Sequence, residues 1–265
     1  MRQYVAAKEF DKTQRLVVLG KDFRYLVQVL RLKEGEVLEV RLPSGNLAQA
    51  VIEKIQSKQL LLRKEEHNLS EIETGVKASD LVHDTNGAAL WLFQFMPKVA
   101  KFDGIIRQAV ECGVAYIVPV LGDFSPKTGD AHREERWNRI VKEATQQSGS
   151  SVLTKVFSPC SLEVALQLWE KESKKLAFFL NEKIEGEKSL RRLFLQERES
   201  DFSFQHIGIA VGCEGGYSEK EIELLKEHNF NSIHFETNIL RCETASLYGI
   251  AIVQNTYWEL MHECN

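Results

Sequence analysis

Two hydrophobic patterns alternate along the chain from residue 88 onward. The run AALWLFQF, residues 88–95, is apolar almost throughout, as in a strand that is covered on both faces. Directly after it, apolar residues recur at the spacing of one helix face, at Phe102, Ile105, Ile106, Ala109 and Val110. Further strands are predicted at 114–120, 175–180, 206–212 and 232–236, and further helices at 133–147, 162–171, 218–228 and 243–263. Strands that alternate with helices predict an α/β domain with a mostly parallel sheet.

The N-terminal part has a different pattern. Short strands are predicted at 36–42, 47–55 and 59–63, with turn residues PSGN between the first two. This punctuation favours a small β-barrel or sandwich. The segment 65–75 is polar and weakly patterned, so a boundary is expected there, with domains at 1–72 and 73–265.

Amino-acid composition disfavours some classes of protein and site but does not by itself indicate a function. A hydrophobic content of 43% with 27% charged residues is that of a globular protein, and the charged start MRQYVAAKEFDK favours a cytoplasmic location. The five cysteines form no CxxC pair and the histidines no HxxxH pair, so neither disulfides nor a metal is expected. Residues 1–72 carry 13 basic against 10 acidic side chains, an excess too small to indicate nucleic acid by itself.

The stretch VGCEGGYSEKE, residues 211–221, places glycines between a predicted strand and a helix that opens with a capping box, Ser218 and Glu221. Its G-x-x-G-G spacing fits neither a dinucleotide fingerprint nor a P-loop. Glu214 would repel a phosphate at a helix N-terminus, so a cationic ligand such as S-adenosylmethionine, a sulfonium, fits better. The alternative is a tight turn with a solvated Glu214.

A second stretch, NILRCETASLYGIAIV at 238–253, connects the last short strand to the last helix. Arg241 and Glu243 flank Cys242, and the small residues Ala245 and Ser246 follow. Small side chains at a helix start permit close packing against a loop or a ligand. The alternative is an ordinary helix start with a glutamate favoured by the helix dipole.

Taken together and in this order, these stretches resemble the RsmE family of ribosomal RNA small-subunit methyltransferases, within the SPOUT superfamily. VGCEGGYSEKE resembles its GPEGG-(F/L)-S-x-x-E motif, and NILRCETA its R-(I/V)-L-R-T-E-T-A motif. Further similarity lies in YLVQVLRLKEGE at 25–36, in 96–120 and in RWNRIVKEATQQSG at 136–149. The resemblance therefore spans nearly the whole chain.

The resemblance implies a PUA-like β-barrel at 1–72 and a SPOUT α/β methyltransferase domain with a C-terminal trefoil knot at 73–265. It implies a homodimer whose interface includes the last helix. It also implies transfer of methyl from S-adenosylmethionine to N3 of a uridine in 16S ribosomal RNA, free or within the small subunit.

Roles follow from the resemblance at individual positions. The implied cofactor contacts are Leu180, Asn181, Gly212, Glu214, Gly215, Gly216, Ile239, Leu240, Thr244 and Ala245. Arg241 would stabilise charge on the uracil carbonyls, and Glu214 and Glu243 are candidate proton acceptors. The implied RNA contacts are Arg2, Arg24, Arg31, Lys33 and Lys98.

Several residues depart from the family pattern. They are Cys213 for proline, Glu236-Thr237 for Leu-Gly, Asn238 and Ser150 for arginines, Asp123-Phe124 for Glu-Arg, Tyr25 for histidine and Gln108 for lysine. Most of these changes remove positive charge. They leave open an RNA-binding relative with lost or altered catalysis, whereas the failed fingerprints disfavour an unrelated nucleotide enzyme.

Overall fold

The computed structural model describes residues 3–65, 87–126, 133–182, 189–198 and 204–262. The chain divides into a smaller unit, Met1–Val82 with Thr145–Gly149, and a larger unit, His83–Ala144 with Ser150–Asn265. The boundary predicted between residues 72 and 73 lies outside the described residues. No helix of the described part is long and apolar enough to cross a membrane.

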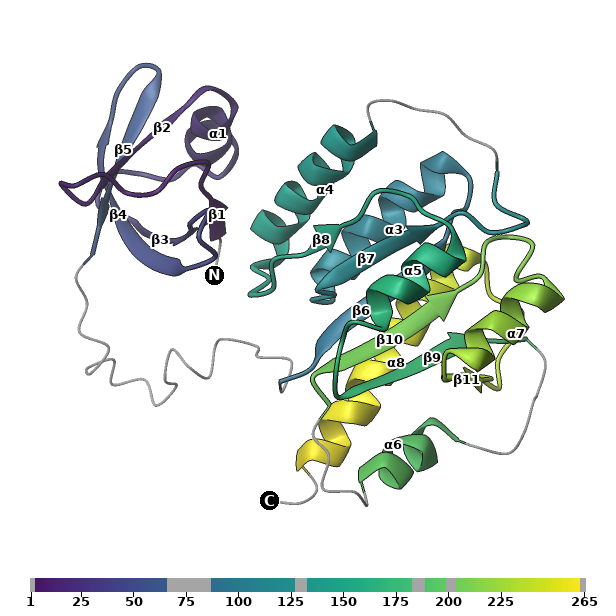
Figure 1. Cartoon of the computed structure of the whole chain (residues 1–265). Helices are drawn as coiled ribbons and strands as arrows, with labels where there is room; N and C mark the ends of the chain where they lie inside the picture. The colour runs from purple at the N-terminus through teal and green to yellow at the C-terminus, as the bar shows by residue number, and fades with distance from the viewer. Residues whose placement is uncertain (1–2, 66–86, 127–132, 183–188, 199–203, 263–265) are drawn as a thin grey trace. The chain divides into compact units, whose positions relative to one another are not determined.

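The smaller unit is a curled five-stranded sheet (Figure 1). Its strands are β1 (Gln3–Val5), β2 (Arg15–Leu19), β3 (Val37–Arg41), β4 (Leu47–Ile55) and β5 (Gln59–Lys64), in the order β1-β3-β4-β5-β2. The three predicted strands are confirmed as β3, β4 and β5. No hydrophobic pattern predicts β1, β2, helix α1 (Gly20–Arg24) or the π-helical turn η1 (Tyr25–Val29). These elements are only three to five residues long, too short to show a period.

The larger unit contains a six-stranded parallel sheet, as predicted from the alternation of strands and helices. Its strands are β6 (Ala89–Phe95), β7 (Tyr116–Val120), β8 (Lys155–Val156), β9 (Lys175–Leu180), β10 (His206–Val211) and β11 (Phe230–Ile233). The order is β11-β9-β10-β6-β7-β8, so β10 is inserted between β9 and β6. All carboxyl ends therefore lie at one edge, where ligands of such sheets bind.

Helices cover both faces of this sheet. One face packs against α3 (Val99–Glu111), α4 (Arg133–Ser148), α6 (Leu190–Arg198) and α8 (Cys242–His262). The other packs against α5 (Leu162–Trp169) and α7 (Glu219–Glu227). In Figure 1, α5 lies in front of the sheet and α8 behind it.

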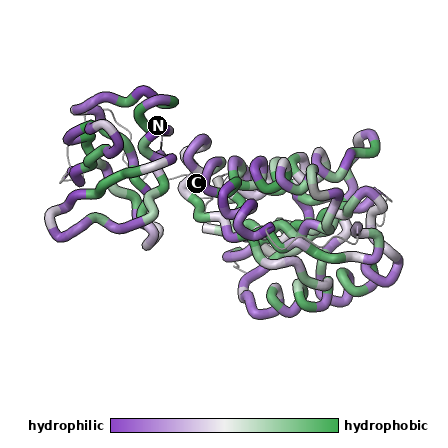
Figure 2. The backbone as a smooth tube through the Cα atoms, turned by 90° about the horizontal axis from the view of Figure 1, so that it is seen from above, coloured by the Kyte–Doolittle hydropathy of each residue, from purple (hydrophilic) through white to green (hydrophobic). Residues whose placement is uncertain are grey.

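Strand β6 shows why its sequence is apolar at every position. Leu90 and Leu92 enter the core under α3 and α8, whereas Trp91, Phe93 and Phe95 enter the core under α5. Helix α3 buries Phe102, Ile105 and Ile106 on one side and exposes Arg107 on the other, and Figure 2 shows helical turns that change between hydrophobic and hydrophilic colours. The double covering predicted from the run at 88–95 is thus confirmed.

The predicted strand at 232–236 is displaced in the structure. Strand β11 pairs with β9 from Phe230 to Ile233 only. Beyond it, the ring nitrogen Nδ1 of His234 lies 3.1 Å from the carbonyl oxygen of Asn181. The sequence analysis also missed β8 and α6, because two residues are too few for a pattern and α6 presents only a short apolar face.

Candidate active site at the carboxyl edge of the sheet

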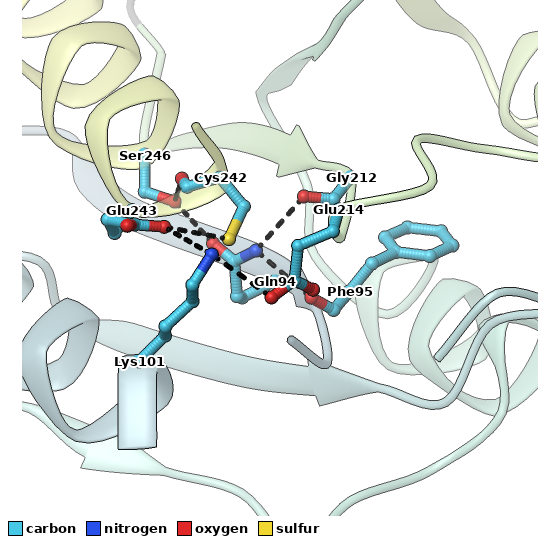
Figure 3. Close-up of polar contacts among 8 residues, drawn as sticks. All are labelled: Gln94, Phe95, Lys101, Gly212, Glu214, Cys242, Glu243 and Ser246. Atoms are coloured by element: carbon cyan, nitrogen blue, oxygen red, sulfur yellow. Dashed lines mark hydrogen bonds and ion pairs between the residues drawn. The ribbon is translucent and has the colours of Figure 1, made fainter. Parts of the chain in front are cut away.

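Gln94, near the end of β6, joins three segments at the carboxyl edge of the sheet. Its side chain is fully buried, and its amide nitrogen lies 3.2 Å from the carbonyl oxygen of Val211 and 3.4 Å from that of Gly212. Its amide oxygen accepts a hydrogen bond from Ser246, in the first turns of α8. The Ser246 hydroxyl also lies 2.7 Å from the Cys242 carbonyl oxygen. Figure 3 shows Gln94 between the ends of β10 and α8.

The glycine-rich stretch forms a tight turn after β10. The amide of Gly216 donates to the carbonyl oxygen of Cys213 at 3.0 Å, and Gly216 has a left-handed backbone with φ of 71°. A methyl group on Gly212 would lie 3.0 Å from the Gly216 backbone, and one on Gly215 would lie 2.8 Å from Cβ of Phe124. The glycines are thus required by packing inside the protein itself, and Glu214 is exposed at the tip of the turn.

The capping box predicted at the start of α7 is confirmed. Ser218 accepts from the Glu221 backbone, and Glu221 accepts from the Ser218 backbone at 2.7 Å. The other carboxylate oxygen of Glu221 accepts from the Asp123 amide at 2.7 Å. The loop after β7 is therefore tied to the helix that follows the glycine turn.

The two sequence motifs meet at Lys101, in the first turn of α3 (Figure 3). Its ammonium nitrogen lies 3.1 Å from Oε1 of Glu214 and 3.2 Å from Oε2 of Glu243. We call these three residues the lysine–carboxylate cluster. Hydrogen bonds to the two glutamates, Glu214 first, raise the pKa of Lys101, so it remains charged at neutral pH.

Both carboxylates of the cluster are ionised at neutral pH. Desolvation alone would raise the pKa of Glu214, but hydrogen bonds from its own amide, from Lys101 and from the Lys98 amide outweigh it and lower that pKa. The hydrogen bond from its own backbone amide, at the helix start, is the main cause that lowers the pKa of Glu243. The cluster therefore carries a net charge of about −1.

Cys242 lies beside the cluster as an unreactive thiol. Its Sγ donates to Oε2 of Glu243 at 3.1 Å. Desolvation and this hydrogen bond raise the pKa of Cys242 to about 12, so the thiol keeps its proton at neutral pH. It is not a nucleophile in this arrangement.

The remaining residues with an implied cofactor role come from two neighbouring segments. Leu180 ends β9 and packs on α8, where a methyl on Gly249 would lie 2.8 Å from its Cδ1. The Asn181 amide donates to the Ile233 carbonyl oxygen at 2.9 Å, which ties this loop to β11. The segment 239–245 follows: Ile239, Arg241 and Thr244 are exposed, and Leu240 and Ala245 are half-buried.

Arg241 is available for a ligand. Its backbone oxygen accepts from the Ala245 amide at 2.8 Å and so begins α8. Its guanidinium is exposed and makes no ion pair within the described part of the chain.

The residues with an implied RNA role are not all in one unit. Arg24, Arg31 and Lys33 are exposed on α1 and on the segment after η1 of the smaller unit. Lys98 is exposed before α3 of the larger unit. Arg2 lies outside the described residues.

Sequence reasoning missed Lys101, Gln94 and Ser246. Lys101 stands three residues after Lys98 in a helix start, where a lysine opposed to the helix dipole is unusual and offers a signal. Gln94 is the one polar residue in the apolar run 88–95, and a polar residue at a buried strand position requires partners. Ser246 gave no signal beyond its small size.

Comparison with known proteins agrees with this arrangement. A family model described as an RNA methyltransferase domain matches residues 85–254. The chain belongs to this RNA methyltransferase family. A second model, described as an RNA methyltransferase PUA domain, matches residues 18–65 of the smaller unit.

The similarity of this RNA methyltransferase to its relatives extends over most of its length. It is 29% identical to ribosomal RNA small subunit methyltransferase E 2 of Borreliella burgdorferi over 243 residues, 88% of this chain and 87% of the relative. It is 28% identical to ribosomal RNA small subunit methyltransferase E of Aquifex aeolicus, over 86% of this chain and 94% of the relative. The resemblance to the RsmE family found in the motifs is confirmed.

A solved structure supports the fold. Ribosomal RNA small subunit methyltransferase E from Neisseria gonorrhoeae, bound to S-adenosyl methionine, is similar with a TM-score of 0.74. The identity is 22%, and the similarity covers 96% of this chain and 97% of that chain. The predicted combination of a PUA-type domain with an α/β methyltransferase domain is confirmed at the level of fold.

Proposed function

We propose that this RNA methyltransferase transfers a methyl group from S-adenosylmethionine to N3 of a uridine in 16S ribosomal RNA. The observation that carries the proposal is the lysine–carboxylate cluster, which brings the glycine turn and the start of α8 together at the carboxyl edge of the sheet. The family, and the names of the relatives, supply the substrate class.

The donor set fits this cofactor better than it fits a phosphate-bearing one. The cluster has a net negative charge, and Glu214 stands at the tip of the glycine turn. Negative charge attracts a sulfonium and repels a phosphate. When bound, the cofactor supplies an electrophilic methyl group.

The residues proposed to hold it lie on three loops. They are Gly212, Glu214, Gly215 and Gly216 of the turn, Leu180 and Asn181 after β9, and Ile239, Leu240, Thr244 and Ala245 around the start of α8. The main task of these loops is alignment, because a methyl transfer needs its reacting atoms in line and close together.

Arg241 is proposed as the residue that faces the target base. Its exposed guanidinium would stabilise negative charge on the uracil carbonyls as N3 loses its proton. Glu214 and Glu243 have lowered pKa values and share one lysine, which makes them weak proton acceptors. We therefore assign them to the charge and shape of the site rather than to removal of the N3 proton.

RNA contact and assembly complete the proposal. Arg24, Arg31 and Lys33 would meet RNA phosphates from the PUA-type domain, and Lys98 from the methyltransferase domain, with Arg2 as a further candidate. A homodimer is proposed through α8, on which Tyr248 and Trp258 keep 40% and 53% of their surface exposed. The trefoil knot and a cytoplasmic location stay predictions.

The test is methyl transfer to small ribosomal subunits that lack the modification. We expect labelled methyl from S-adenosylmethionine to appear as 3-methyluridine in nucleosides analysed by mass spectrometry. Arg241→Ala should lower the maximal rate at saturating RNA and leave cofactor affinity unchanged. Arg107→Met, a charge removed from the exposed side of α3, is the matched control. A wild-type protein that binds cofactor and RNA but methylates no uridine would favour the non-catalytic relative.

A further inference from the structure

We propose that Lys101 is a positioning residue that closes the cofactor site, by holding the glycine turn against the start of α8. This inference rests on the proposed function. Lys101 belongs to neither cofactor motif, and it meets one carboxylate from each of them. Its role is to keep the glycine turn and the start of α8, which lie far apart in the sequence, at a fixed distance from each other.

The geometry leaves the two motifs in need of a counter-charge. Oε1 of Glu214 and Oε2 of Glu243 lie within 3.2 Å of one nitrogen, and hence within about 6 Å of each other. Without the ammonium, two ionised carboxylates at this separation repel. The tip of the turn and the helix start would then be pushed apart, against the hydrogen bond that the Lys98 amide still donates to Glu214.

Buried hydrogen bonds already hold the base of the glycine turn against α8. Lys101 therefore acts on the exposed side chains of the cluster. Gln94 and Ser246 bind the base of the glycine turn to α8 through buried hydrogen bonds. The side chains above them are about one-third exposed: 29% for Lys101, 34% for Glu214 and 29% for Glu243. An exposed ion pair between two flexible side chains contributes little to stability. One ammonium shared by two carboxylates restrains both segments at once, which a single pair does not.

The competing explanation is charge. The two glutamates carry a net charge of −1 together with Lys101 and −2 without it. Loss of Lys101 therefore strengthens the attraction of the site for a cation. S-adenosylmethionine is cationic, whereas its demethylated product S-adenosylhomocysteine has a neutral thioether. If Lys101 positions the two segments, its removal weakens the affinity for both ligands alike. If it acts only through charge, its removal changes the affinity for the cation selectively.

The first experiment measures both affinities by titration calorimetry in the full-length protein. Lys101→Met should lower the affinity for S-adenosylmethionine and the affinity for S-adenosylhomocysteine to a similar extent, by about tenfold. Lys101→Arg should recover most of the loss, because a guanidinium can also bridge two carboxylates. Arg107→Met, which removes a positive charge from the same helix, should change neither affinity.

Adding Glu214→Gln to Lys101→Met should recover part of the affinity for S-adenosylhomocysteine, whose thioether is neutral, since it removes the repulsion between the carboxylates. A merely structural role in α3 would not predict this rescue. Unchanged affinities in Lys101→Met, or a gain in affinity for S-adenosylmethionine with no change for S-adenosylhomocysteine, would overturn the positioning role.

The second experiment needs no ligand and so separates this inference from the proposed function. Hydrogen exchange of the free protein should become faster in Lys101→Met at 212–216 and at 242–246 together. If the wild-type protein binds neither ligand, the proposed function fails while the exchange result still tests the positioning role. If exchange is unchanged in both segments, Lys101 does not hold them.

Discussion

The hydrogen bond between Gln94 and Ser246 offers a direct test of how the site is anchored. The Gln94 side chain is fully buried and Ser246 is 1% exposed, so water cannot replace a lost partner. Ser246→Ala leaves the Gln94 amide oxygen without its donor. Gln94→Leu removes the other partner: the Ser246 hydroxyl still has the Cys242 carbonyl oxygen, whereas the carbonyl oxygens of Val211 and Gly212 lose the Gln94 amide.

The expected energies follow from these partners. A buried polar group left without a partner costs about 1–3 kcal/mol. We therefore expect Ser246→Ala to lower the free energy of unfolding by about 1.5 kcal/mol, and Gln94→Leu by about 2 kcal/mol. In the double variant no amide oxygen remains to be satisfied. Its loss should fall short of the sum of the two single losses by about 1 kcal/mol.

The assay is urea unfolding followed by tryptophan fluorescence. All four tryptophans lie in the larger unit, at 91, 137, 169 and 258, so the signal reports on that unit. A control cycle pairs Ser246→Ala with Thr154→Ala, whose hydroxyl donates to the Val114 carbonyl oxygen at the opposite edge of the sheet. The control pair should be additive. An additive Gln94–Ser246 pair, within about 0.4 kcal/mol, would refute the reasoning.

Three further outcomes are expected. Gly122→Ala would place a methyl 2.5 Å from Oε1 of buried Glu221 and should cost about 2 kcal/mol in the same urea assay, whereas unchanged stability would show that this loop yields easily. The lowered pKa values of Glu214 and Glu243 predict a contribution to cofactor affinity that is present above their ordinary value of 4.5 and lost as pH falls through the lowered values. Calorimetry from neutral pH into the acid range checks it, and an affinity that stays constant for as long as the protein remains folded would count against the cluster. Arg31→Ala should flatten the dependence of RNA affinity on salt by about one unit of slope in filter binding, and an unaltered slope would exclude a phosphate contact.

Much of the larger unit is predictable from its sequence because its signals are long and local. The run at 88–95 and the helix periods of α3 and α4 each repeat one pattern over many residues. The capping box of α7 is a contact between neighbours, so the sequence alone identifies it. Short elements such as β8, and the early end of β11, depend on partners elsewhere in the chain.

The site was predictable in part for the same reason. Each motif is local, and both were recognised. Their meeting point is not local, since Lys101 is more than 100 residues from either glutamate. The resemblance implies that Gly215 contacts the cofactor, and the structure adds Phe124 as the neighbour that a side chain at this position would meet. Contacts of this kind are set by the crossing of chain segments, on which a single sequence is silent.

The pairing of β10 with β6 at the centre of the larger unit has a consequence for how this protein folds. His206 is paired with Ala89, so the first contact between these strands must close a chain of more than 100 residues. Closing such a loop costs entropy before any burial compensates for it, and proteins dominated by distant contacts fold slowly. While β10 is absent, β6 and β9 both present an unpaired edge with apolar side chains, and such edges are templates for aggregation. The strand that completes the sheet and carries the glycine turn is therefore the strand whose arrival limits the lifetime of that vulnerable state.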